Sequence, residues 1–263
     1  MPITHAIKRS LAPIAKQVAP RRFWRRRYRI LSDSALHDDE LLLVRQLCDP
    51  TKVSVDVGAD IGAFTIAMLD RSSSVIAFEP RTAQARELAT MFDTIGAPVR
   101  VEAVALSEHT GASTMRVLVS DPGRSTIEAA NALDDADGSP VETIDVPSSR
   151  LDDFDLDNVG FIKIDVEGHE LAVLRGARAT IERNRPTFLI EAEERHRANA
   201  VGEVMSFLDR LGYDGYFFTG DERRSIADFD PVEHQNSQHI ASWKDGWTRT
   251  GQYVNNFVFL PHS

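Results

Sequence analysis

The sequence has 263 residues, of which 42% are hydrophobic and 27% charged, as in a soluble protein with one large α/β domain and an N-terminal extension. Its single cysteine, Cys48, excludes an intramolecular disulfide, and no apolar run suits a spanning helix or a signal peptide, so we expect a cytoplasmic protein. Residues 1–30 hold nine Lys or Arg and no acid, whereas the remainder holds 21 basic and 40 acidic residues, a net charge of −19, which argues against a nucleic-acid groove across the main domain.

We expect residues 1–48 to form a basic helical extension ahead of a catalytic domain over residues 49–263. Apolar residues recur at helical spacing in the first 18 residues, and residues 20–29 place aromatic side chains among arginines. Such a segment suits a membrane surface or another anionic partner; the alternatives are a poorly ordered terminus and a helix whose arginines pair with the acidic domain. A second helix is predicted over residues 34–47, with Ser34 as its cap.

A strand, a glycine turn and a helix follow. Residues 53–57 are rich in valine and predict a buried parallel strand, and residues 63–69 predict a helix. Between them the pattern Asp56-x-Gly58-x-Asp60-x-Gly62 differs from the dinucleotide spacing G-x-G-x-x-G. An acidic residue at the strand end would repel a pyrophosphate, so the turn suits a cationic or zwitterionic cofactor.

The next strand, residues 75–78, ends at Glu79, which lies 17 residues after Gly62. An acidic residue there can accept hydrogen bonds from both ribose hydroxyls. A nucleoside with an amino-acid tail and a positive sulfur matches S-adenosyl-L-methionine (SAM); another nucleotide in a Rossmann-like turn is the alternative.

The rest of the chain alternates strands with helices, which predicts parallel pairing with right-handed crossovers. We expect helices over residues 81–95, 171–184 and 201–211, a short helix after residue 149, and strands over 114–119, 141–146, 161–166, 187–191, 216–218 and 253–260. Residues 99–107 predict a strand that runs into a loop. Two polar segments, residues 121–140 and 220–251, read as functional loops. In the first we expect Ser125 and Thr126 near the site; in the second Trp243 and Trp247 are candidates either to stack on a sugar or to pack in the core.

The block Ile162-Lys163-Ile164-Asp165-Val166-Glu167-Gly168-His169-Glu170-Leu171, with Leu174-Arg175-Gly176-Ala177 after it, resembles the FkbM family of SAM-dependent O-methyltransferases. The resemblance extends over about residues 50–260 and includes the glycine turn, Phe78-Glu79-Pro80, Ala105-Leu106-Ser107, Leu151-Asp152 and Asn256-Phe257-Val258-Phe259. Asp60 stands where the family usually has Asn.

This resemblance implies a class I, Rossmann-like methyltransferase fold: a seven-stranded, mostly parallel sheet with an antiparallel C-terminal hairpin and helices on both faces. It implies methyl transfer from SAM to a hydroxyl, often on a sugar, glycolipid or secondary metabolite. The motifs place cofactor contacts at Asp56, Gly58, Ala59, Gly62, Glu79, Glu102, Ala103 and Val104. We also expect Asp60, Phe64, Pro80 and Ser125 beside the cofactor.

Methyl transfer needs an aligned acceptor and a base for its proton, and ligands of open α/β sheets lie beyond the carboxyl ends of the strands. The candidate catalytic residues at or just past such ends are Asp165, Glu167, His169 and Glu191. Their structural alternatives are a helix cap for Asp165 and a buried, satisfied side chain for His169. The first three could instead ligate Mg or Mn, but their spacing is no distinctive metal signature, so we expect no metal.

Two other functions stay open at this stage. One is a non-catalytic SAM-binding or scaffold protein, against which the intact glycine turn and acidic block count. The other is methylation of a protein or lipid. Nucleic acid is disfavoured as a partner, because the main domain is acidic and the Asn/Asp-Pro-Pro-Tyr-type motif of amino-group methylases is absent.

Overall fold

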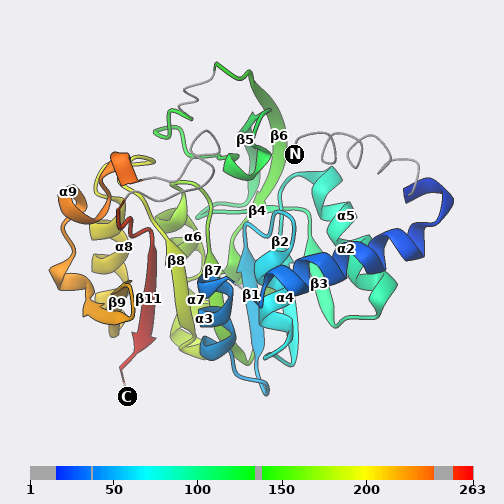
Figure 1. Ribbon diagram of the computed structural model, residues 1–263. Helices are drawn as coiled ribbons and strands as arrows, with labels where there is room; N and C mark the ends of the chain where they lie inside the picture. The colour runs from blue at the N-terminus through cyan, green and yellow to red at the C-terminus, as the bar shows by residue number, and fades with distance from the viewer. Residues whose placement is uncertain (1–15, 37, 134–137, 240–250, 263) are drawn as a thin grey trace.

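The computed structural model describes residues 16–36, 38–133, 138–239 and 251–262, and its centre is an eight-stranded sheet (Figure 1). In spatial order the strands are β10 (Glu222–Ser225), β9 (Tyr213–Thr219), β11 (Asn256–Pro261), β8 (Thr187–Glu191), β7 (Val159–Ile164), β1 (Val53–Val57), β2 (Ser74–Phe78) and β3 (Val99–Glu102). β11 is antiparallel to both its neighbours, and β10 pairs antiparallel with β9. The expected fold class is confirmed, with β10 as an added edge strand.

β1 is an interior strand of this sheet and pairs in parallel with β2 and β7. Val55 lies opposite Ile76 on one side and Ile162 on the other, and all three are buried. The chain runs outward from β1 through β2 to β3 and then crosses to β7. The strand order therefore reverses between β1 and β7, which is where open α/β sheets bind ligands.

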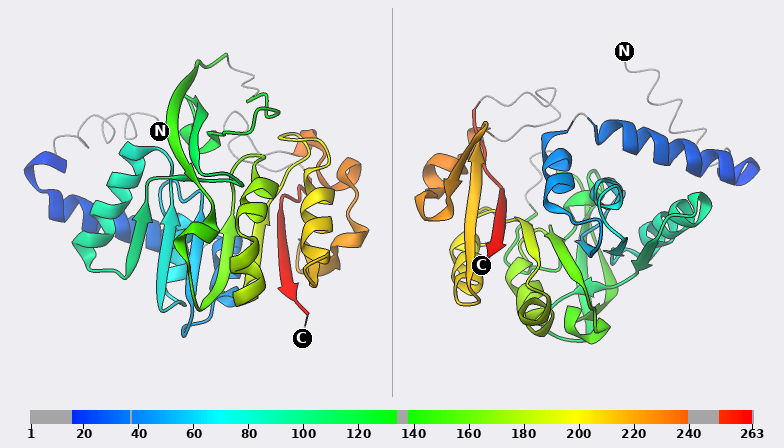
Figure 2. Two further views of the ribbon diagram at one scale, coloured as in Figure 1. Left: turned by 180° about the vertical axis from the view of Figure 1, so that it is seen from behind. Right: turned by 90° about the horizontal axis from the view of Figure 1, so that it is seen from below.

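Helices cover both faces of the sheet, as the view along the strands shows (Figure 2, right). One face packs against α2 (Pro20–Ser34), α3 (Asp39–Leu47), α4 (Ala63–Leu69) and α5 (Thr82–Ile95). The other packs against α6 (Glu170–Gly176), α7 (Arg178–Asn184) and α8 (Ala200–Asp209). Short helices complete the fold: η1 (Pro122–Arg124), η2 (Leu151–Phe154), η3 (Ile226–Asp228), α9 (Pro231–His234) and η4 (Ser237–His239).

A separate three-stranded sheet stands above the carboxyl ends of the central strands (Figure 1). It contains β4 (Ala105–Leu106), β6 (Val141–Ser149) and β5 (Gly111–Leu118), in that order. The strand expected from residue 99 is β3, and the loop expected after it contains the short strand β4, because the chain leaves the central sheet after Glu102 and enters the small sheet at Ala105. The two strands predicted near 114–119 and 141–146 exist and pair with each other.

Two predicted helix boundaries were wrong. Ser34 ends α2 instead of capping the next helix; that cap is Asp38, whose Oδ1 accepts from the backbone N–H of Glu40 and Leu41 at 3.0 and 3.2 Å. The helix expected over 171–184 is two helices, because the Asp152 carboxylate caps a new start by accepting from the backbone of Ala179 and Thr180.

The N-terminal region packs on the domain through α2. Trp24 is 2% exposed and lies among Ile66, Leu88 and Met91 of α4 and α5. None of the helices in the described part of the chain has the length and apolar run needed to cross a membrane. The segment expected as a loop over 220–251 contains β10, η3 and α9, while Trp243 and Trp247 lie outside the described residues.

Candidate active site

A cavity of ≈ 320 Å³ opens at the carboxyl ends of β1, β2 and β7, beneath the small sheet. Its volume is within the range typical of small-molecule sites. It lies at the reversal of strand order, where the fold itself places ligands. Residues from both sheets line it, so the fold brings together segments that are more than 100 residues apart in the chain.

The glycine turn after β1 is fixed by its contact with the end of β7. Gly58 has φ +84°, and a Cβ at this position would lie 1.9 Å from the backbone oxygen of Asp165. Only glycine fits such an approach, so the turn and the residue after β7 form one wall of the cavity.

Glu79, at the end of β2, is 2% exposed and already holds four hydrogen bonds. Oε1 accepts from the backbone N–H and Nε of Arg81 at 2.9 and 2.8 Å. Oε2 accepts from the backbone N–H of Asp60 at 3.0 Å and from Arg81 Nη2 at 3.1 Å. Arg81 Nη2 also donates to Asp60 Oδ1 at 2.6 Å. Burial lowers the pKa of Arg81, but Glu79 and Asp60 outweigh it and raise that pKa overall, so this cation is permanent.

Lys163 lines the cavity close to two acidic residues, Asp165 and Asp56. It is 1% exposed, its Nζ donates to Asp165 Oδ2 at 2.9 Å, and it lies 4.2 Å from the centre of the Phe64 ring. Burial lowers the pKa of Lys163, but the Asp165 and Asp56 carboxylates raise it above its ordinary value. Burial raises the pKa of Asp56, whose Oδ2 accepts from Thr65 at 2.5 Å while Oδ1 has no hydrogen-bond partner among the described residues.

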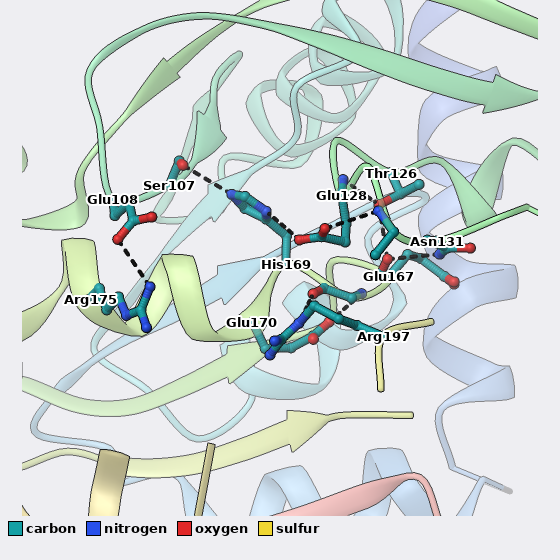
Figure 3. A network of polar contacts seen from close by, with 12 residues as sticks. Ser107, Glu108, Thr126, Glu128, Asn131, Glu167, His169, Glu170, Arg175 and Arg197 are labelled. Carbon is teal, nitrogen blue, oxygen red and sulfur yellow. Dashed lines mark hydrogen bonds and ion pairs between the residues drawn. The ribbon is translucent and has the colours of Figure 1, made fainter. Parts of the chain in front are cut away.

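His169 projects into the cavity between two polar partners (Figure 3). Its Nε2 lies 2.9 Å from Ser107 Oγ, and its Nδ1 lies 3.3 Å from Glu128 Oε2. Burial lowers the pKa of His169, and Glu128 offsets only part of that effect, so the imidazole is neutral at neutral pH. A bond to the Glu128 carboxylate requires the proton on Nδ1, which leaves Nε2 free to accept one.

The segment that carries Glu128 is tied to the turn after β7. Thr126 Oγ1 and Asn131 Nδ2 donate to the backbone oxygen of Glu167 at 2.9 and 2.8 Å (Figure 3). Glu167 has φ +55°, a conformation that a non-glycine residue adopts at a cost, typically where surrounding contacts impose it. These contacts hold Glu128 and His169 in fixed relation to each other.

Comparison with known proteins identifies the family of this chain. The profile described as "Methyltransferase FkbM domain" matches residues 56–214, which is more than half of the chain. The chain belongs to the FkbM methyltransferase family. No curated protein matches the chain significantly.

One solved structure agrees with this FkbM-family assignment at the level of fold. The crystal structure of methyltransferase FkbM from Methylobacillus flagellatus KT is 17% identical, with a TM-score of 0.50 over 80% of this chain. This chain spans only 44% of the length of that protein. An rRNA methylase from Streptococcus thermophilus is 10% identical, with a TM-score of 0.49 over 85% of this chain and 95% of its own.

Most of the predicted cofactor residues of this FkbM-family chain line the cavity. They are Gly58, Ala59, Asp60, Phe64, Glu79, Pro80, Val104 and Ser125. Four others are not part of its lining. Asp56 lies beneath it, Gly62 begins α4 against Leu88, and Glu102 and Ala103 lie at the end of β3, where the Glu102 side chain pairs with Arg100.

Of the four predicted catalytic residues, two line the cavity and two do not. Asp165 and His169 line the cavity. Glu167 turns toward His196, with Oε2 3.0 Å from Nε2, and Glu191 accepts from Asn255 Nδ2 at 2.7 Å. Burial, and then the nearby Asp165 carboxylate, raise the pKa of Glu191 well above its ordinary value.

Sequence reasoning missed three charged residues of the site. Lys163 belongs to the family motif but has no predicted role, although a lysine in the middle of an apolar strand indicates a buried charge that needs partners. Arg81 directly follows Glu79-Pro80 in the sequence. Glu128 lies in the polar segment 121–140, where nothing in the sequence distinguishes it. No three His, Cys, Asp or Glu side chains form a metal site within the described ranges.

Proposed function

We propose that this protein transfers a methyl group from SAM to a hydroxyl of a sugar, glycolipid or secondary metabolite. The observation that carries the proposal is that Glu79, His169 and Asp165 line the same cavity. The first can bind a nucleoside, and the other two can hold and deprotonate an acceptor. The acceptor class rests on the family resemblance in the sequence.

The residues on the cofactor side fit SAM. Glu79 is a buried carboxylate facing the cavity, as ribose hydroxyls require, and Val104 with its small neighbour Ala105 offers an apolar wall for a base. Asp60 and Asp165 add negative charge next to a cofactor whose sulfonium is positive. Bound SAM would supply the electrophilic methyl group. Because all acceptor positions of Glu79 are taken, Arg81 has to release its side-chain contacts for ribose to bind.

On the acceptor side, His169 is the group that takes the proton. Its neutral imidazole accepts at Nε2, where Ser107 Oγ lies at 2.9 Å, so an acceptor hydroxyl has to take the place of Ser107 at this nitrogen. An acceptor hydroxyl in this position would give its proton to Nε2 as its oxygen bonds to the methyl group. Glu128 would then stabilise the resulting imidazolium through Nδ1. Asp165, held by Lys163, is placed to orient the hydroxyl or the cofactor.

The test combines cofactor turnover with identification of the product. The full-length protein is incubated with SAM and fractions of small molecules and glycolipids from cell extract, and S-adenosylhomocysteine is quantified by mass spectrometry. We expect one fraction to sustain turnover and to contain a product heavier by one CH₂ unit, and Glu79→Ala and His169→Ala to reduce both signals. A product methylated on nitrogen or carbon would overturn the hydroxyl assignment. Tight SAM binding without turnover in any fraction would favour the scaffold alternative.

A further inference from the structure

The outward face of α2 is a stripe of arginines. Arg21, Arg22, Arg25, Arg26 and Arg29 are all exposed, and at 100° per residue they span an arc of about 140°. Within the described ranges, none of these five guanidinium groups forms a hydrogen bond or an ion pair with another residue. The acidic first turn of α3 begins only after this stripe has ended.

The aromatic residues of α2 point the other way, into the domain. Trp24 is 2% exposed and its ring packs edge-to-face against Phe23, with centroids 4.9 Å apart. Lys16 lies 5.0 Å over the Trp24 ring and pairs with Glu87 of α5 at 2.6 Å. α2 runs along the outside of its helical layer (Figure 2, right), so its buried side is anchored while the arginine side faces outward.

Two aliphatic side chains flank the arginine stripe. Val18, just before α2, is 79% exposed, and Ile30, near its end, is 53% exposed. Their exposure is unfavourable in water, and an arginine-rich helix with exposed aliphatic residues suits the boundary between lipid headgroups and acyl chains. Arginine also binds phosphate oxygens in pairs of hydrogen bonds.

We propose that this face of α2 docks the protein on a lipid surface with anionic headgroups. The five arginines would bind headgroup phosphates, and Val18 and Ile30 would enter the upper acyl region. The proposal concerns attachment alone and does not depend on methyl transfer.

Lipid is favoured over nucleic acid by the direction of the aromatic side chains. Non-specific binding of single-stranded nucleic acid uses exposed aromatic rings on which bases stack. In α2 the rings of Phe23, Trp24 and Tyr28 belong to the apolar cluster on the domain side, which leaves arginines and aliphatic groups outside. The outer face of a helix also provides no groove for a duplex backbone.

Co-sedimentation with vesicles tests the proposal on the full chain. We expect binding to phosphatidylcholine vesicles containing phosphatidylserine, none to pure phosphatidylcholine, and weakening as salt is raised. Each surface-near arginine changes partitioning about fivefold, so Arg22→Gln, Arg25→Gln and Arg29→Gln together should lower it about a hundredfold. The matched change to lysine at the same three positions should retain most of the binding.

The control removes three exposed arginines elsewhere, Arg71→Gln, Arg178→Gln and Arg210→Gln, for the same change in net charge. Unchanged circular dichroism, thermal unfolding and SAM affinity would establish that every variant is folded. The proposal is overturned if both triple glutamine variants lose binding equally, if neutral vesicles bind as well as anionic ones, or if the protein does not sediment at all. It is likewise overturned if single-stranded RNA displaces the vesicles through the same arginines, which would assign the face to nucleic acid.

Discussion

The Arg81 guanidinium fills the acceptor positions that the Glu79 carboxylate would offer to a ribose. Its Nε donates to Oε1 at 2.8 Å and its Nη2 to Oε2 at 3.1 Å, while backbone N–H groups fill the two remaining positions. A carboxylate has about four such positions in all. Arg81 therefore competes with any hydroxyl that binds Glu79. Its ion pair with Asp60 can hold the guanidinium in place when its bonds to Glu79 are released.

Arg81→Leu is expected to tighten SAM binding. The substitution removes the competing donor and also a positive charge close to where a cationic cofactor binds. We expect about a tenfold lower Kd, ~1.4 kcal/mol, with a smaller change for S-adenosylhomocysteine, which lacks the sulfonium charge. Calorimetry on the folded variant measures both, with Arg86→Leu, in the helix that follows Arg81, as the control. An unchanged affinity would show that Arg81 does not compete with the ribose, and a weaker affinity would show that it helps to hold the cofactor.

Glu79→Ala is expected to act in the opposite direction. Each hydrogen bond from a ribose hydroxyl to this carboxylate contributes on the order of 1.5–3 kcal/mol. Loss of the carboxylate also leaves the positive charge of Arg81 without this partner, next to a cationic cofactor. We expect SAM affinity to fall at least tenfold. The double variant with Arg81→Leu should recover part of this loss, because the two residues interact directly and their effects are not additive. Full affinity in Glu79→Ala alone would remove Glu79 from the cofactor site.

The pair of His169 and Glu128 predicts a change in the pH profile. Turnover needs a neutral imidazole, and a carboxylate at Nδ1 favours its protonated form. Glu128→Gln should therefore lower the apparent pKa on the acidic limb of kcat while lowering kcat itself, since the imidazolium loses its partner. His169→Ala should cost about 10²–10⁴-fold in kcat with little change in SAM affinity. The measurement is the rate of S-adenosylhomocysteine formation across pH 5–9 with the active extract fraction.

Glu108→Gln is the comparison for that experiment. Glu108 also raises the pKa of His169, but less than Glu128 does, and its side chain pairs with Arg175 at 3.4 Å. Its pH profile should therefore shift in the same direction as that of Glu128→Gln, and by less. Identical profiles for Glu128→Gln and the unmodified protein would remove Glu128 from the reaction.

The central sheet could be predicted because its signals are local. Runs of β-branched residues bounded by turn residues mark β1, β2, β7 and β8, and the parallel order brings their acidic ends together. The small sheet could not be predicted as a separate unit. β5 and β6 show the same alternation as other strands, and which sheet a strand joins depends on contacts between distant segments.

The site residues, too, could be predicted only where their signal is local in the sequence. Glu79 and Asp165 follow from their places at strand ends, whereas Glu128 is positioned by the contacts of Thr126 and Asn131 with the Glu167 backbone, which no spacing reveals. The burial of Trp24, in contrast, could have been predicted from the spacing of apolar residues in the sequence. Residues 24, 28 and 31 recur at helical spacing, and this phase puts them on the side opposite the arginines.

Burial of Glu170 predicts that the fold loses stability as pH rises. Glu170 is 1% exposed; burial raises its pKa from 4.5 to about 7, although the backbone N–H of Gly168 donates to Oε1 at 2.8 Å and opposes the shift. An acid whose pKa is higher in the folded state binds more protons when folded. Its stabilising contribution is therefore complete below pH 4.5 and is lost as pH rises through about 7.

Chemical denaturation at pH 5 and pH 8 measures this contribution. We expect the free energy of unfolding to fall by about 2–3 kcal/mol between the two values through this residue alone. Glu170→Gln cannot ionise, so its stability should fall less over the same interval, and the difference between the two proteins isolates Glu170 from all other titrating groups. Glu182→Gln, on the exposed side of α7, should leave the slope unchanged. If the unmodified protein and Glu170→Gln lose stability in parallel, Glu170 ionises in the folded protein at its ordinary pKa and the effect assigned to its burial is wrong.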